Sequence, residues 1–482
     1  MPNRLHLTMA MASALIAMSI TLPIATGADP STPTSQVDGL FANWDLPRSP
    51  GCAVAVMKNG RIAYERGYGM ADLDHGVKIT PATVFHVGSI AKQFTASAVL
   101  MLAAEGKLSL DDPIQKYVPE VANFDTPITL RELLHHTSGL RDWQELLVFD
   151  GWRIYGDVVT ERDVLDVVSR QRDLNFPPGS EFNYSNTGYS LLAYVVARVS
   201  GRSFPDFTAA RIFRPLGMEH THFRDNHAQT IKNLALGYRQ REDESFEEAD
   251  PNLDTVGCTN LMTTVEDLSR WDENFYSTRV GGPTVVTQMT EPGKLNDGTQ
   301  IIYGAGLFLG PNAAEHSGSD AGYVADMIRF PAQHLSVAVL CNLASIDVMG
   351  LTHRVAEIYG GRLPASSSAA EPSLPKRVKH APSPKELLQF VGLYRSPEIQ
   401  IPYNITADGS QLSMHALKIG AVPMVRVEGD EFSCTQGEPT NVQRWRVRFI
   451  RDNRGHVSGF LINTDYFIRN LRFIRVTTNQ AP

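Results

Sequence analysis

The 482-residue chain has few cysteines and no cluster of basic residues, and both absences restrict its function. Lysine and arginine together number 44 against 52 acidic residues, which gives a formal net charge of −8. Proteins that bind phosphate backbones need a clustered cationic face, so we expect no nucleic-acid partner. Hydrophobic residues make up 43% and charged residues 20% of the chain, which is the balance of an ordinary globular protein.

Four cysteines in a chain of this length are too few for a disulfide scaffold. Cys52 and Cys341 each lie inside an apolar strand-like run, so we expect two buried thiols. Cys258 belongs to a Gly-Cys-Thr-Asn turn, in which an exposed side chain is one of the possibilities. Cys434 belongs to a polar late strand.

Motifs typical of zinc sites are also missing. No cysteine–histidine spacing of a structural zinc site occurs, and no His-Glu-x-x-His motif of a zinc peptidase is present. The pairs His135-His136 and His220-x-His222 suit a metal in principle, but structural histidines are far commoner. We therefore expect no metal and no other cofactor.

No long hydrophobic run follows the first thirty residues. Residues 1–28 have the layout of a signal peptide: Arg4 is followed by the apolar run Leu7–Ala25, and small residues end that run. We predict an exported protein, periplasmic or secreted. A retained membrane anchor is the alternative, because the run is nearly long enough to span a bilayer.

Residues 36–360 combine strand patterns at both ends with helical patterns between them. Apolar and alternating runs near residues 51–67 and 323–341 indicate strands, and Asn59-Gly60 indicates a hairpin turn. This order predicts an α+β domain in which one antiparallel sheet is assembled from both chain ends. The helical patterns lie at Gly88–Gly106, Leu130–His135, Thr160–Arg170, Asn186–Val199, Val265–Tyr276 and Val348–Tyr359.

The remaining chain differs in texture. Residues 361–384 are rich in Ser, Ala and Pro and are interpreted as a linker. Residues 385–482 contain short alternating segments separated by turn signals, which predict a small all-β barrel-like domain, with a sandwich as the alternative. Three roles are compatible with this domain: it covers the cleft of the first domain, joins the subunits of a homo-oligomer, or binds wall polymer.

Ser89-x-x-Lys92 is the first candidate for chemistry. The motif lies at the start of a helical pattern, where a three-residue step places the hydroxyl and the amine on one face. A lysine whose pKa is lowered by burial activates a serine by taking its proton. The motif alone is weak: Ser373-x-x-Lys376 also matches, although it lies in the linker and contains Pro375.

Two later segments offer groups that would complete such a site. Tyr184-Ser185-Asn186 lies on a loop before an apolar helix, where a phenol can move a proton and an amide can hold a substrate carbonyl. His316-Ser317-Gly318-Ser319 precedes a strand, and its small residues allow a ligand to approach the backbone. Taken singly, a capping Asn186 and a surface His316 are the simpler explanations.

In this order the three segments resemble the penicillin-recognising serine hydrolases, which include class C β-lactamases, D-alanyl-D-alanine carboxypeptidases, D-aminopeptidases and related esterases. The resemblance covers roughly residues 36–360 and implies a β-lactamase/transpeptidase-like fold. It also implies a serine hydrolase that forms an acyl-enzyme on small-molecule or short-peptide amides, esters or β-lactams. Further likeness lies in Phe85-His86-Val87-Gly88, Leu133-Leu134-His135-His136-Thr137-Ser138-Gly139-Leu140, Pro215-Leu216-Gly217-Met218 and Tyr303-Gly304-Ala305-Gly306-Leu307.

The resemblance also implies roles for single residues. Ser89 would be acylated, Lys92 would take its proton, and Tyr184 would relay protons to the leaving group and to the deacylating water. Asn186 would hold the amide side of the substrate, with the segment His316-Ser317-Gly318-Ser319 as the other wall of the site. The backbone N–H groups of Ser89 and Ser319 would form the oxyanion hole.

Two departures from the family pattern matter. His316 stands where β-lactamases usually have a lysine, so a permanent cation for a substrate carboxylate is missing; this favours an esterase or D-amino-acid amidase. We expect activity to depend on pH between about 6 and 7.5 through titration of His316. Gly257-Cys258-Thr259-Asn260 replaces a plainer glycine-rich turn.

Other classes fit less well. An α/β-hydrolase is disfavoured because no Gly-x-Ser-x-Gly occurs. The alternative that stays open is a non-hydrolytic sensor or binding protein that kept the fold and is acylated without turnover.

Overall fold

The computed structural model describes residues 32–362, 383–417, 419–436 and 443–477. The predicted signal peptide at residues 1–28 lies outside the described residues, as does the second motif match at Ser373 and Lys376. Most of the predicted linker, residues 363–382, lies outside them as well. Within the described ranges, no helix combines the length and the apolar character needed to cross a membrane.

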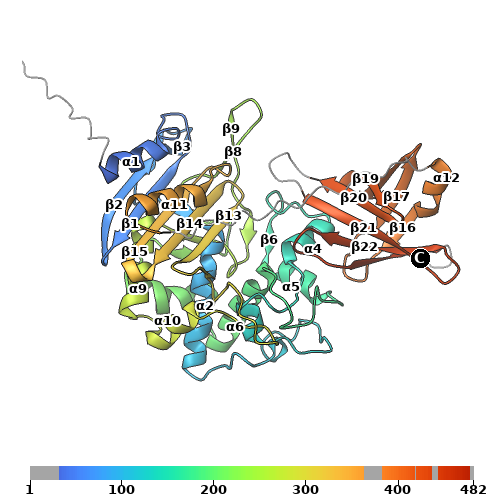
Figure 1. Cartoon of the computed structure of the whole chain (residues 1–482), viewed down its shortest axis with the longest axis horizontal. Helices are drawn as coiled ribbons and strands as arrows, with labels where there is room; N and C mark the ends of the chain where they lie inside the picture. Colours follow the sequence, from blue (N-terminus) through green and yellow to red (C-terminus); the bar gives the residue numbers. More distant parts are fainter. Residues whose placement is uncertain (1–31, 363–382, 418, 437–442, 478–482) are drawn as a thin grey trace, which may run out of the picture.

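A six-stranded antiparallel sheet forms the centre of the first domain (Figure 1). Strands from both ends of this domain meet in it, because the first strand pairs with the last from Cys52↔Cys341 to Lys58↔Leu335. The predicted α+β fold with one sheet assembled from both chain ends is confirmed. In spatial order the strands are β12 (Phe308–Leu309), β13 (Ala314–Asp320), β14 (Tyr323–Phe330), β15 (Leu335–Cys341), β1 (Cys52–Lys58) and β2 (Arg61–Tyr68).

The helices lie close to the predicted segments. Capping boxes at Thr129 and Thr160 begin two of them by satisfying the free amides of the first turn. The helices of this domain are α1 (Pro33–Phe41), α2 (Ala91–Ala104), α3 (Leu130–Leu134), α4 (Trp143–Phe149), α5 (Glu161–Ser169), α6 (Asn186–Ser200), α7 (Phe204–Thr208), α8 (Arg214–Leu216), α9 (Val265–Ser277), α10 (Gly282–Thr290) and α11 (Val348–Ile358). Short strands complete it: β3 (Met70–Asp72), β4 (Val77–Lys78), β5 (Phe85–His86), β6 (Val159–Thr160), β7 (His222–Phe223), β8 (Tyr238–Gln240), β9 (Phe246–Glu248), β10 (Leu253–Asp254) and β11 (Leu261–Thr263).

The two faces of the central sheet carry separate cores, because successive strand residues point to opposite sides. On one face Val54 and Val56 pack with residues of α1 and α11. On the other face Ala53 and Ala55 pack with residues of α2 and α9. The sheet therefore separates a layer that contains α2 from a layer that contains α11 (Figure 1).

The C-terminal residues form a closed eight-stranded barrel, which confirms the barrel-like prediction and excludes the sandwich. Its first strand pairs with both the second and the last, so the sheet has no free edge. The short alternating segments predicted over residues 385–482 correspond to strands of this barrel, and the late strand predicted around Cys434 is β20. The strands are β16 (Gly392–Arg395), β17 (Tyr403–Asp408), β18 (Gln411–Ala416), β19 (Gly420–Glu428), β20 (Glu431–Gln436), β21 (Gln443–Arg451), β22 (Val457–Thr464) and β23 (Leu471–Arg475).

The cysteines differ from the expectation of free thiols. Cys52 and Cys341 are direct cross-strand partners and form a disulfide across 289 residues of sequence, so the prediction of two buried thiols is wrong. Their pairing depends on the register of two distant strands, which neither local pattern reveals. Cys258 and Cys434 are free and buried. Of the possibilities considered for Cys258, exposure is therefore excluded.

The barrel lies beside α4 (Figure 1), and polar contacts join it to the first domain. Arg141 and Glu398 form an ion pair at 2.6 Å with both side chains almost fully buried. Arg141 also donates to the backbone oxygen of Arg469, and the side-chain amide of Asn183 donates to the backbone oxygen of Tyr466 at 2.9 Å. The barrel therefore touches the loop that leads into α6.

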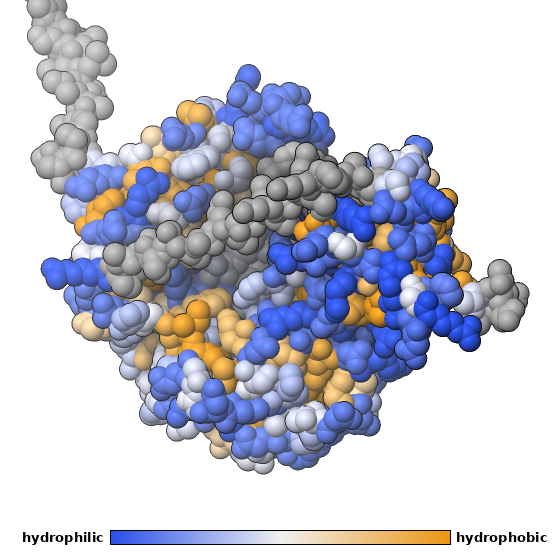
Figure 2. Space-filling model, turned by 45° about the vertical axis from the view of Figure 1, so that its right-hand side comes forward, coloured by the Kyte–Doolittle hydropathy of each residue, from blue (hydrophilic) through white to orange (hydrophobic). Residues whose placement is uncertain are grey.

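The face of the molecule in Figure 2 is mostly hydrophilic, with hydrophobic residues in several separate groups. Large hydrophobic side chains that are exposed among the described residues are scattered over both domains, from Leu46 and Ile302 to Leu417 and Ile474. Such scattered exposure is ordinary for a globular protein surface.

Candidate active site

Ser89 lies in a 3₁₀ turn, Gly88–Ile90, between β5 and α2. Gly88 has φ +51°, and a Cβ atom there would lie only 2.7 Å from the backbone nitrogen of Ser319. Glycine is thus required both by the backbone conformation and by the close approach of β13. The turn leaves Ser89 half-buried at the start of the helix that the sequence predicted.

Lys92 is the buried partner of this serine. Its Nζ lies 2.9 Å from Ser89 Oγ, 2.8 Å from Asn186 Oδ1 and 2.8 Å from the backbone oxygen of Cys258. The side chain is fully buried. Burial lowers the pKa of Lys92 to about 8, against the opposing effect of Cys258, Asp142 and Asp320. A substantial fraction of this amine is therefore neutral near pH 8 and able to accept a proton.

The loop before α6 adds Tyr184 and Asn186. Lys92 Nζ lies 4.8 Å from the centroid of the Tyr184 ring. Burial raises the pKa of Tyr184 well above its ordinary value, and a hydrogen bond with the Ser89 side chain opposes that rise. The phenol is therefore protonated at neutral pH and is placed to pass its proton to a group bound at Ser89.

Asn186 is held in place from two sides. Its backbone N–H donates to Asp142 Oδ2 at 2.6 Å, and its side-chain Nδ2 donates to Gln144 Oε1 at 2.7 Å. Because Nδ2 is engaged with Gln144, the amide oxygen points to Lys92. Asn186 is the first residue of α6, and Ser185 occupies the cap position, so Asn186 is not the helix cap.

Residues 316–319 lie along β13, and their side chains alternate between the two faces of the sheet. His316 and Gly318 pair with Met327 and Ala325, which belong to the core that faces α2. Ser317 and Ser319 are directed to the opposite face, together with Val324. The two serines therefore offer only their backbone groups to the side on which Ser89 lies.

The backbones of residues 87–89 and 318–319 are in direct contact. A Cβ atom on Gly318 would lie 2.1 Å from the oxygen of Val87 and 2.7 Å from the nitrogen of Ser89. Only glycine fits this position. The contact places the backbone nitrogen atoms of Ser89 and Ser319 on neighbouring segments, as a pair of oxyanion donors would require.

His316 is buried and has both ring nitrogens engaged. Nδ1 donates to the backbone oxygen of Ser317 at 2.6 Å, which leaves Nε2 to accept from the Tyr303 hydroxyl at 3.1 Å. Burial, and then the charge of Lys92, lower the pKa of His316 to about 3. The expected titration of His316 between pH 6 and 7.5 is therefore wrong: the ring is neutral throughout that range and supplies no cation.

Several residues hold the site in place although the sequence analysis gave them no role or did not name them. His86 accepts from the N–H of Gly88 through Nδ1, and its Nε2 donates to Asn260 Oδ1 at 3.1 Å. Asp320 accepts from the hydroxyl of Thr259 at 2.6 Å. Asp142, one of the groups that hold Asn186, had no sequence signal beyond its position as the cap of α4.

The first histidine pair considered for metal binding, His135-His136, has other partners. The Nδ1 atom of His135 lies 3.0 Å from the backbone oxygen of Gly304. His136 accepts from the N–H of Ser185 and packs its ring between Tyr184 and Tyr303, with ring centroids at 4.3 and 4.6 Å. Burial lowers the pKa of both histidines, to about 4 for His135. They support the walls of the site.

Known proteins resemble both domains of this chain. A family model described as Beta-lactamase matches residues 42–358, and one described as Domain of unknown function (DUF3471) matches residues 376–475. The D-aminopeptidase of Gluconobacter oxydans (strain 621H) is 28% identical over 329 residues, which make up 67% of this chain and 62% of that protein. The chain thus spans less than two thirds of the length of that relative.

Solved structures show the same fold. The octameric penicillin-binding protein homologue from Pyrococcus abyssi has a TM-score of 0.60 and 24% identity, and covers 92% of this chain and 99% of its own. The D-amino acid amidase from Ochrobactrum anthropi SV3, solved with L-phenylalanine, has a TM-score of 0.53 and 21% identity, and covers 68% of this chain and 97% of its own.

Proposed function

The chain belongs to the beta-lactamase family, whose model matches residues 42–358, and from this premise we propose that it is an exported serine hydrolase that forms an acyl-enzyme at Ser89. The observation that carries the proposal is the buried contact of 2.9 Å between Lys92 Nζ and Ser89 Oγ, with the pKa of Lys92 lowered to about 8. An alcohol becomes a nucleophile when a neutral amine at hydrogen-bond distance takes its proton.

The steps follow from the groups in place. Lys92 takes the hydroxyl proton as Ser89 Oγ attacks the substrate carbonyl, and the N–H groups of Ser89 and Ser319 donate to the oxyanion. Tyr184 gives its proton to the leaving amine or alcohol as the carbonyl–leaving-group bond breaks, and the proton on Lys92 replaces it. Water then attacks the ester under the same groups and releases the acid and Ser89.

We propose amides or esters of small D-amino acids as substrates, in preference to penicillins. The neutral His316 ring is saturated with hydrogen bonds and offers no positive charge to a substrate carboxylate. The similarity to a D-aminopeptidase supports this substrate class.

Turnover of a substrate panel by the purified chain tests the proposal. D-alanine p-nitroanilide, its L enantiomer, p-nitrophenyl acetate and nitrocefin would be compared at one pH. We expect turnover of the D-amide or the ester at least about tenfold above nitrocefin, corresponding to about 1.4 kcal/mol of discrimination. Faster turnover of nitrocefin than of every amide and ester would contradict the substrate assignment.

The sensor alternative gives a different result in the same assay. A sensor would release one equivalent of nitrophenol in a burst and then stop, because its acyl-enzyme is not hydrolysed. The hydrogen-bonded Tyr184 and Lys92 favour turnover, since both are placed to activate the deacylating water. Steady release after the burst separates the hydrolase from the sensor.

Export, a further part of the proposal, is supported by the disulfide between Cys52 and Cys341, since disulfides persist mainly in oxidising compartments. N-terminal sequencing of the mature protein from the periplasm or medium would test it: a first residue near position 29 is expected, and an intact N-terminus in the cytosol would contradict it. Assembly into homo-oligomers through the barrel stays a prediction, measurable by light scattering.

A further inference from the structure

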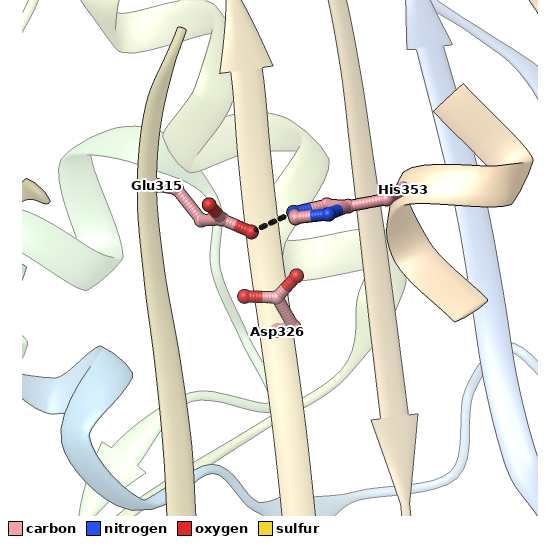
Figure 3. Close-up of side chains that lie close together, drawn as sticks. All are labelled: Glu315, Asp326 and His353. Atoms are coloured by element: carbon pink, nitrogen blue, oxygen red, sulfur yellow. Dashed lines mark hydrogen bonds and ion pairs between the residues drawn. The ribbon is translucent and has the colours of Figure 1, made fainter. Parts of the chain in front are cut away.

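Three ionisable side chains converge on the face of the central sheet opposite to His316 (Figure 3). Glu315 comes from β13, Asp326 from β14 and His353 from α11. One ligand atom of each lies within 4.8 Å of the others, and His353 Nε2 lies 2.5 Å from Glu315 Oε1. Three elements distant in sequence therefore bring two carboxylates and an imidazole to one point.

Asp326 is the least satisfied member of this cluster. Its side chain is fully buried, and neither carboxylate oxygen forms a hydrogen bond of good geometry, although Glu315 and Thr352 lie close to it. An ionised carboxylate buried in this way is unfavourable without a counter-charge, and a metal ion held by the cluster would supply one.

No lysine or arginine in the described ranges forms an ion pair with either carboxylate. Arg329, on the same strand as Asp326, is directed to the other face and pairs with Asp272 at 2.6 Å. His353 is the one cationic partner, and Glu315 already engages it. The net charge of the cluster with both acids ionised is thus negative even when His353 is protonated.

We propose that Glu315, Asp326 and His353 bind a divalent cation, with Zn²⁺ best suited to one imidazole and two carboxylates. Two carboxylates balance the two positive charges, and a water molecule completes four-coordination. The side chains of Glu315 and His353 are 20% and 30% exposed, so the ion reaches the buried Asp326 from the surface.

The ion would fasten β13, β14 and α11 together behind the active site. Glu315 directly precedes His316, so β13 carries one proposed metal ligand on one face and a wall of the site on the other. The proposed role is structural: the ion stabilises β13 and takes no part in acyl transfer. It does not depend on the proposed hydrolase activity.

Zinc binding by the full chain after removal of metals with a chelator tests this site. Calorimetric titration with ZnCl₂ is expected to show one ion per chain, and zinc at one hundred times Kd is expected to raise Tm by about 5 °C. Glu315→Gln, Asp326→Asn and His353→Gln should each weaken binding by about 100-fold. His227→Gln is the matched control, because His227 pairs with Asp254 alone, and it should bind zinc like the wild type.

A proton shared between the two carboxylates is the competing explanation for the buried Asp326. It predicts no zinc binding by the wild type, and a metal-free Tm for Asp326→Asn equal to or above that of the wild type. Absence of zinc binding would overturn the proposal. Zinc binding that all three ligand variants retain would overturn it too, and circular dichroism of each variant separates loss of binding from loss of fold.

Discussion

The interior of the barrel and the interior beside Ser89 are equally buried but are made of different residues. Inside the barrel, aromatic rings pack on one another, as Phe449 does with Phe390 and Phe460 at centroid distances of 4.5 and 5.6 Å. Beside Ser89 the buried groups are polar and are paired, as Lys92 is with Asn186 and Cys258. Aromatic packing supplies stability alone, whereas burial of an ionisable group such as Lys92 moves its pKa away from the ordinary range. The comparison places the chemistry in the first domain.

The largest effect is expected for Ser89→Ala, which removes the nucleophile. Loss of a catalytic serine lowers kcat by roughly 10⁶ in enzymes of this logic, and ester hydrolysis here should fall to the background rate. Ser97→Ala is the matched control: Ser97 lies further along α2, and its buried hydroxyl has no hydrogen-bond partner. Equal activity of Ser89→Ala and Ser97→Ala would show that Ser89 is not the nucleophile and that the first domain does not act through it.

Gly318→Ala is expected to cost about 10²–10³ in kcat, because its methyl group would push apart the backbones that carry the two oxyanion donors. Gly310→Ala serves as its control. A Cβ atom at Gly310 meets only an ordinary contact of 3.5 Å with the oxygen of Ala313. Steady-state kinetics on one ester measures kcat of both variants. An unchanged kcat in Gly318→Ala would contradict the assignment of the Ser319 N–H as an oxyanion donor.

Asn183→Ala tests whether the barrel positions the catalytic loop. The substitution removes the 2.9 Å hydrogen bond to Tyr466 next to Tyr184. One such bond contributes about 1 kcal/mol, so kcat/KM should fall by at most about fivefold. Asn404→Ala, on the exposed side of β17, should leave kcat/KM unchanged. A loss above about a hundredfold would mean that the barrel is part of the catalytic machinery.

The smallest effect on kcat is expected for Phe449→Ala in the barrel. Removing this buried ring should lower the free energy of unfolding by about 3–5 kcal/mol while kcat at low temperature stays unchanged. The exposed Arg448→Ala should alter neither quantity. Chemical denaturation and ester kinetics on the same samples measure both, and a parallel fall in kcat would contradict the separation of roles.

The sequence predicted the sheet from both chain ends because β1 and β15 are apolar runs of strand length. It predicted Ser89, Lys92, Tyr184 and Asn186 because their motifs are local. The disulfide could not be predicted, because it depends on the register Cys52↔Cys341 between distant strands.

The titration of His316 was wrong for a similar reason. Its pKa is set by burial and by Lys92, which the motif does not specify. The cluster of Glu315, Asp326 and His353 could not be predicted from the sequence either, because three separate elements contribute one residue each.

Activation of Ser89 requires the unprotonated form of Lys92, whose pKa is lowered to about 8. The most direct test is the rate at which a fluorophosphonate labels Ser89 between pH 5 and 10, followed by intact mass and peptide mapping. Since only the unprotonated amine accepts the proton, the rate should fall about tenfold per pH unit below the pKa and level off above it. His316, with a pKa of about 3, adds no step in this range. A rate that does not change with pH, or a label on another residue, would contradict the account.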